Sequence, residues 1–194
     1  MASDHLTAVA DNVVALQAKK AASKPRRLNF AFAGDIKPQT NGLYLVKGLI
    51  PSGLLAVFGH SNSGKTAVAG DMALHIAAGF EYRGRRTRQA LVVWAALEAP
   101  DSMANRVVAW SSHHNIELGE LRWAMLSGSL DLRHANSVKE LAEVLGDIEA
   151  QAGEPVVLLV IDTLARAMPG ANENASEDMG AVISNLGRLL AEFS

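Results

Sequence analysis

The chain has 194 residues, of which 49% are hydrophobic and 20% charged, which suits one globular α/β domain and excludes general disorder. It has no cysteine, which excludes disulfides and thiolate zinc sites, and its net charge of −2 gives no bulk attraction to nucleic acid or membrane. No apolar run is long enough to span a bilayer, and the N-terminus lacks the positive start and apolar core of a signal peptide. We therefore expect a soluble, cytoplasmic protein with no membrane partner.

The first 53 residues divide at a proline. Residues 1–24 carry apolar side chains at helical spacing and lysines near their end, which predicts an N-terminal helical arm. Pro25 interrupts this pattern, and residues 25–53 are rich in Pro, Gly, Asn and Arg, which indicates an irregular lead-in. The core domain is expected over residues 54–194.

From residue 54 onward, apolar strands alternate with amphipathic helices. This alternation predicts an α/β fold with a parallel sheet and helices on both faces. Strands are expected at 54–59, 91–97, the start of 123–132, and 156–162; the helices after them should end near Ala78, Ser111, Ala152 and Ala191. Ser137 and Glu140 have the spacing of a capping box, which predicts the start of the third of these helices.

Residues 59–66, GHSNSGKT, match the phosphate-loop pattern G-x-x-x-x-G-K-[ST] at every fixed position. Glycines let backbone N–H groups turn toward a phosphate, and the following helix adds its positive N-terminus. A chance match in a Gly-rich turn is the alternative, but the apolar strand before and the helix after favour a nucleotide site. The expected binding residues are Gly59, His60, Ser61, Asn62, Ser63, Gly64, Lys65, Thr66 and Ala67, with Lys65 on the β/γ-phosphates and Thr66 on Mg²⁺.

Two carboxylates follow buried strands. Asp162 ends VVLLVID, so it should face the ligand crevice at the carboxyl edge of the sheet and hold Mg²⁺, although it could instead cap the next segment. Thr163, next to it, is a weaker candidate for contact with the attacking water. Glu98 directly follows LVVWAAL and is the candidate for orienting water. Its spacing alone favours catalysis only slightly over a solvated turn residue.

Three segments together resemble a known family: YLVKGLIPSGLLAVFGHSNSGKT, GRRTRQALVVWAALEAPDSMANRVVAW and VVLLVIDTLARAMPGANENASEDM. They are similar to RecA-like P-loop NTPases of the RepA/AAA_25 group, which includes plasmid and phage replicative hexameric helicases. The resemblance covers roughly residues 40–194. It implies a RecA-like fold, ATP hydrolysis with Mg²⁺, a hexameric ring on single-stranded DNA, and Glu98 as the catalytic carboxylate beside Lys65. His60 and Asn62 depart from the Pro and Gly common in this group, but both occupy variable positions.

Other features allow more than one interpretation. Four arginines at 83, 85, 86 and 88 could contact nucleic acid or a neighbouring subunit, but a solvated turn is favoured. Arg106 could be structural or could reach a neighbour's nucleotide. His113 and His114 are expected at the surface rather than on a metal, and the three tryptophans in the core. The loop over 169–178 is interpreted as a linker that responds to nucleotide.

The leading hypothesis is an ATPase motor of a replicative DNA helicase, and the alternative is a nucleotide-gated adaptor that assembles protein partners without moving DNA. A small-molecule kinase is disfavoured because no lid with paired arginines follows the third strand. In RecA-like cores a later strand lies between the phosphate-loop strand and the strand ending in the metal-binding Asp. The resemblance therefore implies a core truncated at its C-terminus, with a sensor and any trans-acting arginine beyond residue 194, and weak ATP binding with little hydrolysis by this chain alone.

Overall fold

The computed structural model describes residues 31–38, 44–60, 62–171 and 176–193. The chain divides into two compact units, Met1–Thr40 and Asn41–Ser194. The described part of the first unit contains the short 3-10 helix η1 (Ala33–Asp35). The helix predicted over 1–24 lies outside the described residues, so the fold described below is that of the second unit.

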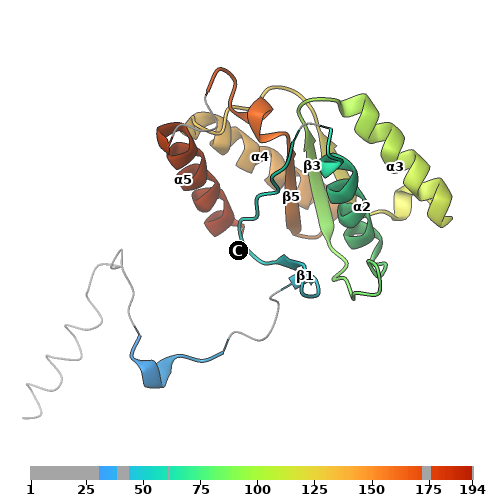
Figure 1. Ribbon diagram of the computed structural model, residues 1–194, viewed down its shortest axis with the longest axis horizontal. Coiled ribbons are helices and arrows are strands. Elements are labelled where there is room, and N and C mark those ends of the chain that lie inside the picture. The colour runs from blue at the N-terminus through green and yellow to red at the C-terminus, as the bar shows by residue number, and fades with distance from the viewer. Residues whose placement is uncertain (1–30, 39–43, 61, 172–175, 194) are drawn as a thin grey trace, which may run out of the picture. The chain divides into compact units, whose positions relative to one another are not determined.

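A three-stranded parallel sheet forms the centre of the second unit, in the order β4-β3-β5 (Figure 1). Its strands are β3 (Leu91–Ala96), β4 (Trp123–Leu126) and β5 (Val156–Asp162). All six residues of β3 are apolar and buried, as is typical of a central parallel strand covered on both faces. The strands predicted at 91–97, at the start of 123–132 and at 156–162 are therefore confirmed.

Helices cover both faces of this sheet: α2 (Lys65–Ala78) and α3 (Pro100–His114) on one, α4 (Ala135–Ala152) and α5 (Ser176–Glu192) on the other (Figure 1). Alternate residues of β3 serve the two layers, because successive side chains of a strand point to opposite faces. Trp94 packs in the cluster that includes α2 and α3, whereas Val93 packs in the cluster that includes α4 and α5. The predicted α/β fold with a parallel sheet is confirmed. No helix of the described residues is long and apolar enough to cross a membrane.

The helix boundaries have local causes. Pro100 stands in the first turn of α3, where its missing N–H costs no helical hydrogen bond. The helices α2, α3 and α4 are followed by Gly79, Asn115 and Gly153, each in the left-handed conformation that commonly terminates a helix. These residues set where each helix ends and where the chain turns back toward the sheet.

The capping box predicted at Ser137 and Glu140 is wrong. α4 begins at Ala135, with His134 as the residue before it, so both side chains lie inside the helix. Asp131 accepts two hydrogen bonds from the Arg133 guanidinium, at 3.0 and 2.7 Å, and its carbonyl accepts one from the His134 N–H. This turn already orients the chain, so the helix starts three residues earlier than the side-chain pattern indicates.

Residues 44–51 form an antiparallel hairpin of β1 (Tyr44–Val46) and β2 (Ile50–Pro51). Leu45, Val46 and Ile50 are buried in the same cluster as α2 and Trp94. The prediction of an irregular lead-in over 25–53 therefore misses a piece of the core. Strands this short carry too few residues for a periodic pattern to reveal them.

The strand predicted at 54–59 does not form. Residues 54–60 belong to no strand and are all exposed, and Phe58 is 84% exposed. β5 lies at the edge of its sheet, with β3 as its one neighbour among the described strands. An apolar run becomes a strand only when it finds a hydrogen-bonding partner, and this segment reaches α2 without one.

Candidate nucleotide-binding site

The phosphate loop curls tightly in front of α2. Gly64, the residue before the helix, has φ +84°, a left-handed conformation that strains any residue with a Cβ. A Cβ on Gly59 would lie 3.0 Å from Ser63 Oγ, so the two ends of the loop approach closely. Asn62 has φ 60°, which agrees with the tolerance of asparagine for this region. Ser61 lies outside the described residues.

Lys65 is the first residue of α2, and its side chain folds back over the loop. Its Nζ donates hydrogen bonds to the carbonyl oxygens of Gly59, at 2.7 Å, and His60, at 2.8 Å. The ammonium group thus stands beside the N-terminus of a 14-residue helix, where free backbone N–H groups and the helix dipole already favour an anion. This is the electrostatic setting that a triphosphate needs.

Thr66 joins the loop to the sheet. Its hydroxyl donates a hydrogen bond to Asp162 Oδ1 at 3.1 Å, so the first turn of α2 meets the carboxyl end of β5. Burial raises the pKa of Asp162, and the nearby Glu98 carboxylate raises it further. The Thr66 hydrogen bond and the charges of Arg106 and Lys65 act in the opposite direction.

The Thr66 and Asp162 oxygens fit Mg²⁺, which prefers hard oxygen ligands. Within the described ranges, no three His, Cys, Asp or Glu side chains come together in a way that could hold a metal ion. Mg²⁺ needs no such cage, because it keeps several waters and takes further oxygens from bound phosphates. Thr66 and Asp162 are therefore the side chains that would hold it.

Glu98 lies at the same edge of the sheet. The backbone N–H of Leu97 donates to the carbonyl oxygen of Asp162 at 2.9 Å, and Glu98 follows immediately and is exposed. The influence of its carboxylate on the pKa of Asp162 shows that the two acids share one electrostatic environment. The structure thus brings together Lys65, Thr66, Asp162 and Glu98, which are separated by up to 97 positions in the sequence.

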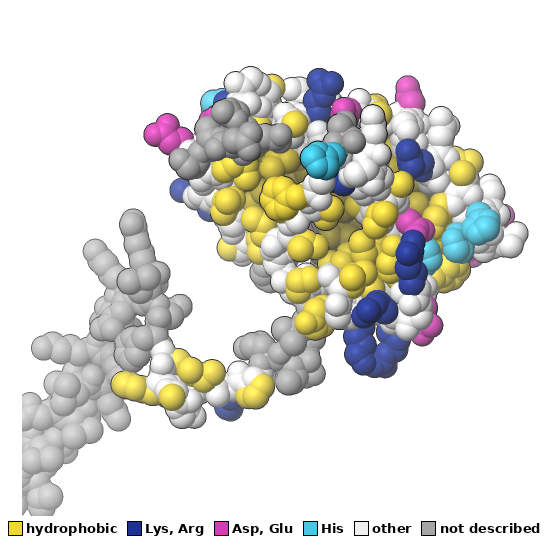
Figure 2. All heavy atoms as spheres, in the orientation of Figure 1, with side chains coloured by type: hydrophobic (Ala, Val, Ile, Leu, Met, Phe, Trp, Pro, Cys, Tyr) yellow, Lys and Arg dark blue, Asp and Glu magenta, His cyan; other side chains and the backbone are white. Residues whose placement is uncertain are grey.

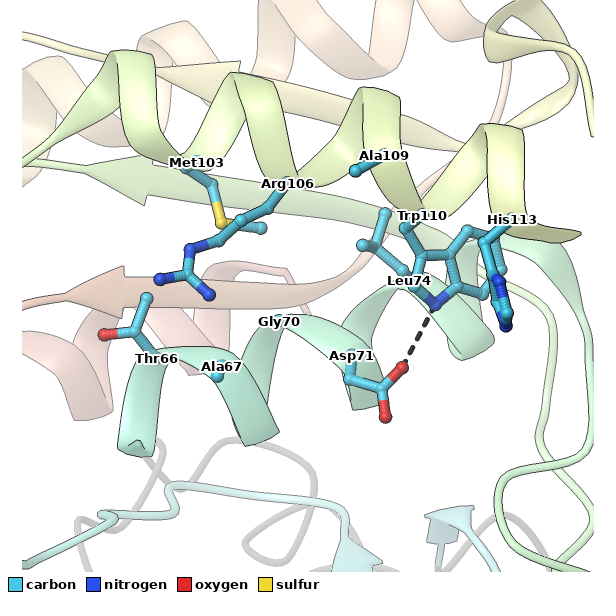
Figure 3. A pocket seen from close by; sticks show the side chains of 10 residues that line it. All are labelled: Thr66, Ala67, Gly70, Asp71, Leu74, Met103, Arg106, Ala109, Trp110 and His113. Carbon is cyan, nitrogen blue, oxygen red and sulfur yellow. Dashed lines mark hydrogen bonds between the residues drawn. The ribbon is translucent and has the colours of Figure 1, made fainter. Parts of the chain in front are cut away.

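A groove of about 330 Å³ runs between α2 and α3, from Thr66 at one end to His113 at the other (Figure 3). Arg106 extends from α3 across this groove, and its guanidinium points toward Thr66 (Figure 3). Its charge lowers the pKa of Asp162. The sequence leaves open whether Arg106 is structural or reaches a neighbour's nucleotide, whereas the structure directs it to the site of its own chain.

Sequence reasoning misses the rest of this groove. Gly70 allows α3 to approach, because a Cβ there would lie 3.2 Å from Met103 Cε. Asp71 accepts a hydrogen bond from Trp110 Nε1 at 3.1 Å, which ties the two helices together near the far end (Figure 3). No motif marks these residues, because their partners are more than 30 positions away.

The arginine cluster and the two histidines lie away from the phosphate loop. The four arginines are exposed in the turn between α2 and β3, at the end of β3 opposite Glu98. His113 and His114 end α3; burial is the main cause that lowers the pKa of His114. Trp94 is fully buried, which confirms its core position. Thr163 precedes η3 (Leu164–Ala167), and residues 172–175 of the predicted linker lie outside the described residues.

A parallel sheet whose strand-end carboxylate meets a glycine-rich loop at a helix N-terminus defines a P-loop NTPase. The chain belongs to the AAA domain family, since the model of that family, AAA_25, matches residues 21–193. No curated protein and no solved structure matches the chain. Membership confirms an AAA-type P-loop ATPase domain, and the narrower grouping with replicative helicases stays a prediction.

Proposed function

We propose that this chain is the ATP-hydrolysing motor domain of a replicative-type DNA helicase, which works as a hexameric ring on single-stranded DNA. The observation that carries the ATPase part is the meeting of three features at one edge of the sheet: the phosphate loop, the Thr66–Asp162 contact and Glu98. The AAA domain match supports the same class. The helicase part rests on the sequence resemblance.

In this mechanism the phosphate loop binds the nucleotide, and the residues at the strand ends prepare it for hydrolysis. Lys65 and the N-terminus of α2 hold the β- and γ-phosphates, while Thr66 and Asp162 hold Mg²⁺. When bound, the metal neutralises charge on the phosphates. Glu98 accepts a hydrogen bond from the attacking water and orients it toward the γ-phosphorus. Burial disfavours the charged form of Asp162, and the positive charges of Arg106 and Lys65 favour it.

Arg106 acts in this scheme as a second cation of the same chain. Its guanidinium points across the groove toward Thr66 and is within electrostatic reach of Asp162 (Figure 3). A guanidinium so placed stabilises negative charge that builds on the phosphates during transfer, and it favours the ionised form of Asp162. An arginine in cis makes this contribution independent of a neighbouring subunit.

Two substitutions separate binding from chemistry. Lys65→Ala should abolish detectable ATP binding, measured by titration of a fluorescent ATP analogue, because the phosphates lose their mobile cation. Glu98→Gln should leave that affinity within about two-fold but lower any phosphate release by a factor on the order of 100 or more, because the water loses its carboxylate. Glu140→Gln, at an exposed glutamate on α4, is the matched control and should change neither. Normal hydrolysis by Glu98→Gln would rule out the role assigned to Glu98.

The helicase and adaptor hypotheses differ in their response to DNA. A ring motor should show a nucleotide-dependent increase in mass that single-stranded DNA enhances, and DNA should stimulate its ATPase activity. Mass photometry with and without a poly-dT oligonucleotide measures the first, and phosphate release measures the second. Nucleotide-dependent assembly with no response of either quantity to DNA would favour the adaptor.

A further inference from the structure

The turn between α2 and β3 is a tightly ordered hairpin, here called the basic turn (residues 82–88). Tyr82 and Arg85 exchange two backbone hydrogen bonds of 2.9 Å each, which leaves Arg83 and Gly84 as a two-residue tip. Both tip residues are left-handed, with φ of 50° and 72°. This is the geometry of the turns that suit the twist of a β-hairpin, so the tip is held in one conformation.

Contacts with β1 and the core fix the basic turn further. The Lys47 N–H donates to Arg86 O at 3.0 Å, and the Arg88 N–H donates to Leu45 O at 2.8 Å. The Tyr82 side chain is buried. The backbone that carries the arginines is therefore anchored at its tip, along its length and through its one large apolar side chain.

The basic turn concentrates positive charge that the rest of the described structure does not neutralise. Its arginines are exposed, as is the adjacent Lys47, and none of these five side chains forms an ion pair within the described residues. Arg83 lies over the Tyr82 ring at 5.4 Å, and Arg85 donates to Lys47 O at 3.1 Å, so both are held in place without losing their charge. Figure 2 shows Lys and Arg side chains grouped at the lower edge, where Figure 1 places this turn.

An exposed aromatic residue lies next to the basic turn along β1. Tyr44, which begins β1, is 45% exposed and precedes Leu45, whose carbonyl oxygen accepts the hydrogen bond from the Arg88 N–H. The ring of Phe80 instead packs near Trp110 and His114, with ring centroids 6.0 and 5.9 Å away. Fixed cations with an exposed tyrosine beside them match what single-stranded nucleic acid offers, namely spaced phosphates and unpaired bases. Duplex DNA would bind the cations through its phosphates, but its paired bases would not be free to stack on an aromatic ring.

We propose that the basic turn, together with Lys47, binds the phosphate backbone of single-stranded nucleic acid, with Tyr44 available to stack on its bases. This surface and the phosphate loop lie at opposite ends of α2, which starts at Lys65 and ends at Ala78, just before the turn. Strand contact and hydrolysis thus occupy separate places joined by one helix. The choice of nucleic acid over another polyanion rests on the motor function proposed above.

The test uses the full chain and a fluorescein-labelled 20-nucleotide poly-dT, with binding followed by anisotropy from 50 to 200 mM salt. Arg86→Gln/Arg88→Gln removes two charges two residues apart and spares the arginines that hold the tip. Each lost phosphate contact should lower the slope of log K against log salt by about 0.7, so the double variant should lose about 1.4. Its affinity should fall on the order of ten-fold at 100 mM salt.

The matched control is Lys139→Gln/Arg188→Gln, which removes the same charge from exposed positions on α4 and α5 and should leave both quantities unchanged. Tyr44→Leu should weaken binding about five-fold or more with no change in slope, because stacking is not salt-dependent in the way that phosphate contacts are. A slope change in this variant, or no loss of affinity, would remove Tyr44 from the surface.

Several outcomes would overturn the proposal. These are undetectable binding of poly-dT by the unsubstituted chain, equal losses in the two double variants, or equally tight binding of a poly-glutamate of the same charge. Nucleotide titration distinguishes a failure of this proposal from a failure of the proposed ATPase function. If Lys65→Ala loses ATP while the chain ignores poly-dT, the ATPase stands and the basic turn does not bind DNA.

Discussion

β3 and the segment over residues 54–60 both lead to the nucleotide site, but the fold holds them in different ways. β3 has a strand on each side and helices on both faces, and each of its residues is buried. The segment 54–60 belongs to no strand and is exposed along its whole length, although its first five residues, LLAVF, are as apolar as β3. The phosphate loop therefore sits at the junction of a rigid region and a loosely held one.

The difference shows what positions the site. The sheet edge at the candidate site is defined by β3 and β5, whose ladder ends with the hydrogen bond from Leu97 N to Asp162 O. The phosphate loop is joined to that edge by the residues that follow it, through α2 and the Thr66–Asp162 hydrogen bond. The geometry of the site thus depends on helix α2 and does not depend on the segment that precedes the loop. Substitutions on the two sides should have unequal effects.

The largest difference is expected between two aromatic residues. Trp94 in β3 is fully buried, so Trp94→Ala should lower the free energy of unfolding by about 3–5 kcal/mol through lost contacts and the cavity left behind. Phe58 in the segment 54–60 is mostly exposed, so Phe58→Ala should change it by less than about 0.5 kcal/mol. Urea unfolding followed by circular dichroism measures both. A loss of more than about 2 kcal/mol at Phe58 would show that the segment is packed, contrary to the structure.

A smaller difference is expected between two glycines at the two ends of α2. Gly64 and Gly79 are both left-handed, so alanine at either costs about 1–2 kcal/mol. At Gly79 a Cβ would also lie 3.0 Å from Gln89 Cβ, and the rigid surroundings should make Gly79→Ala lower the free energy of unfolding. At Gly64 a Cβ meets nothing within 4 Å, and the loosely held loop can relax.

Gly64→Ala should therefore appear mainly as weaker nucleotide binding, by roughly ten-fold, which is the same 1–2 kcal/mol in an affinity. Calorimetric nucleotide titration and urea unfolding of both variants make the comparison. Equal losses of stability with unchanged affinity would mean that the two ends of α2 are held alike.

The same contrast explains what the sequence could and could not predict. Asp162 and Glu98 each follow a strongly apolar run that does form a strand, so their meeting at one sheet edge follows from the parallel topology. The phosphate loop is recognised from its own residue pattern. The strand at 54–59 was predicted from equally good local evidence and is wrong, because a strand requires a partner that local composition does not specify. The direction of Arg106 depends on how α3 crosses α2, which spacing along one helix cannot reveal.

The smallest expected effects concern two aspartates whose pKa values move in opposite directions. Asp131 follows β4, and its hydrogen bonds from Arg133 are the main cause that holds its pKa below the ordinary 3.8. A lowered pKa means that the ionised form stabilises the fold above about pH 4, and that this stabilisation is lost as the pH falls through the lowered value. Asp131→Asn should therefore lower the Tm at neutral pH, with a difference that narrows as the pH falls below about 4.

Substitution of Asp162 should have the opposite effect on the Tm when it is measured with a chelator and without nucleotide. Burial raises its pKa above 3.8, so the stability linked to its protonated form is complete below about pH 4 and is lost as the pH rises through the raised value. Asp162→Asn should consequently raise the Tm at neutral pH and match the unsubstituted chain near pH 4, by differential scanning fluorimetry from pH 3.5 to 7.5. Adding Mg²⁺ and ATP should reverse that order, because the metal needs the carboxylate. If Asp162→Asn is instead less stable than the unsubstituted chain at neutral pH in chelator, the Asp162 carboxylate is well solvated and stabilises the fold. That result would mean that electrostatic interactions, rather than burial, set its place at the site.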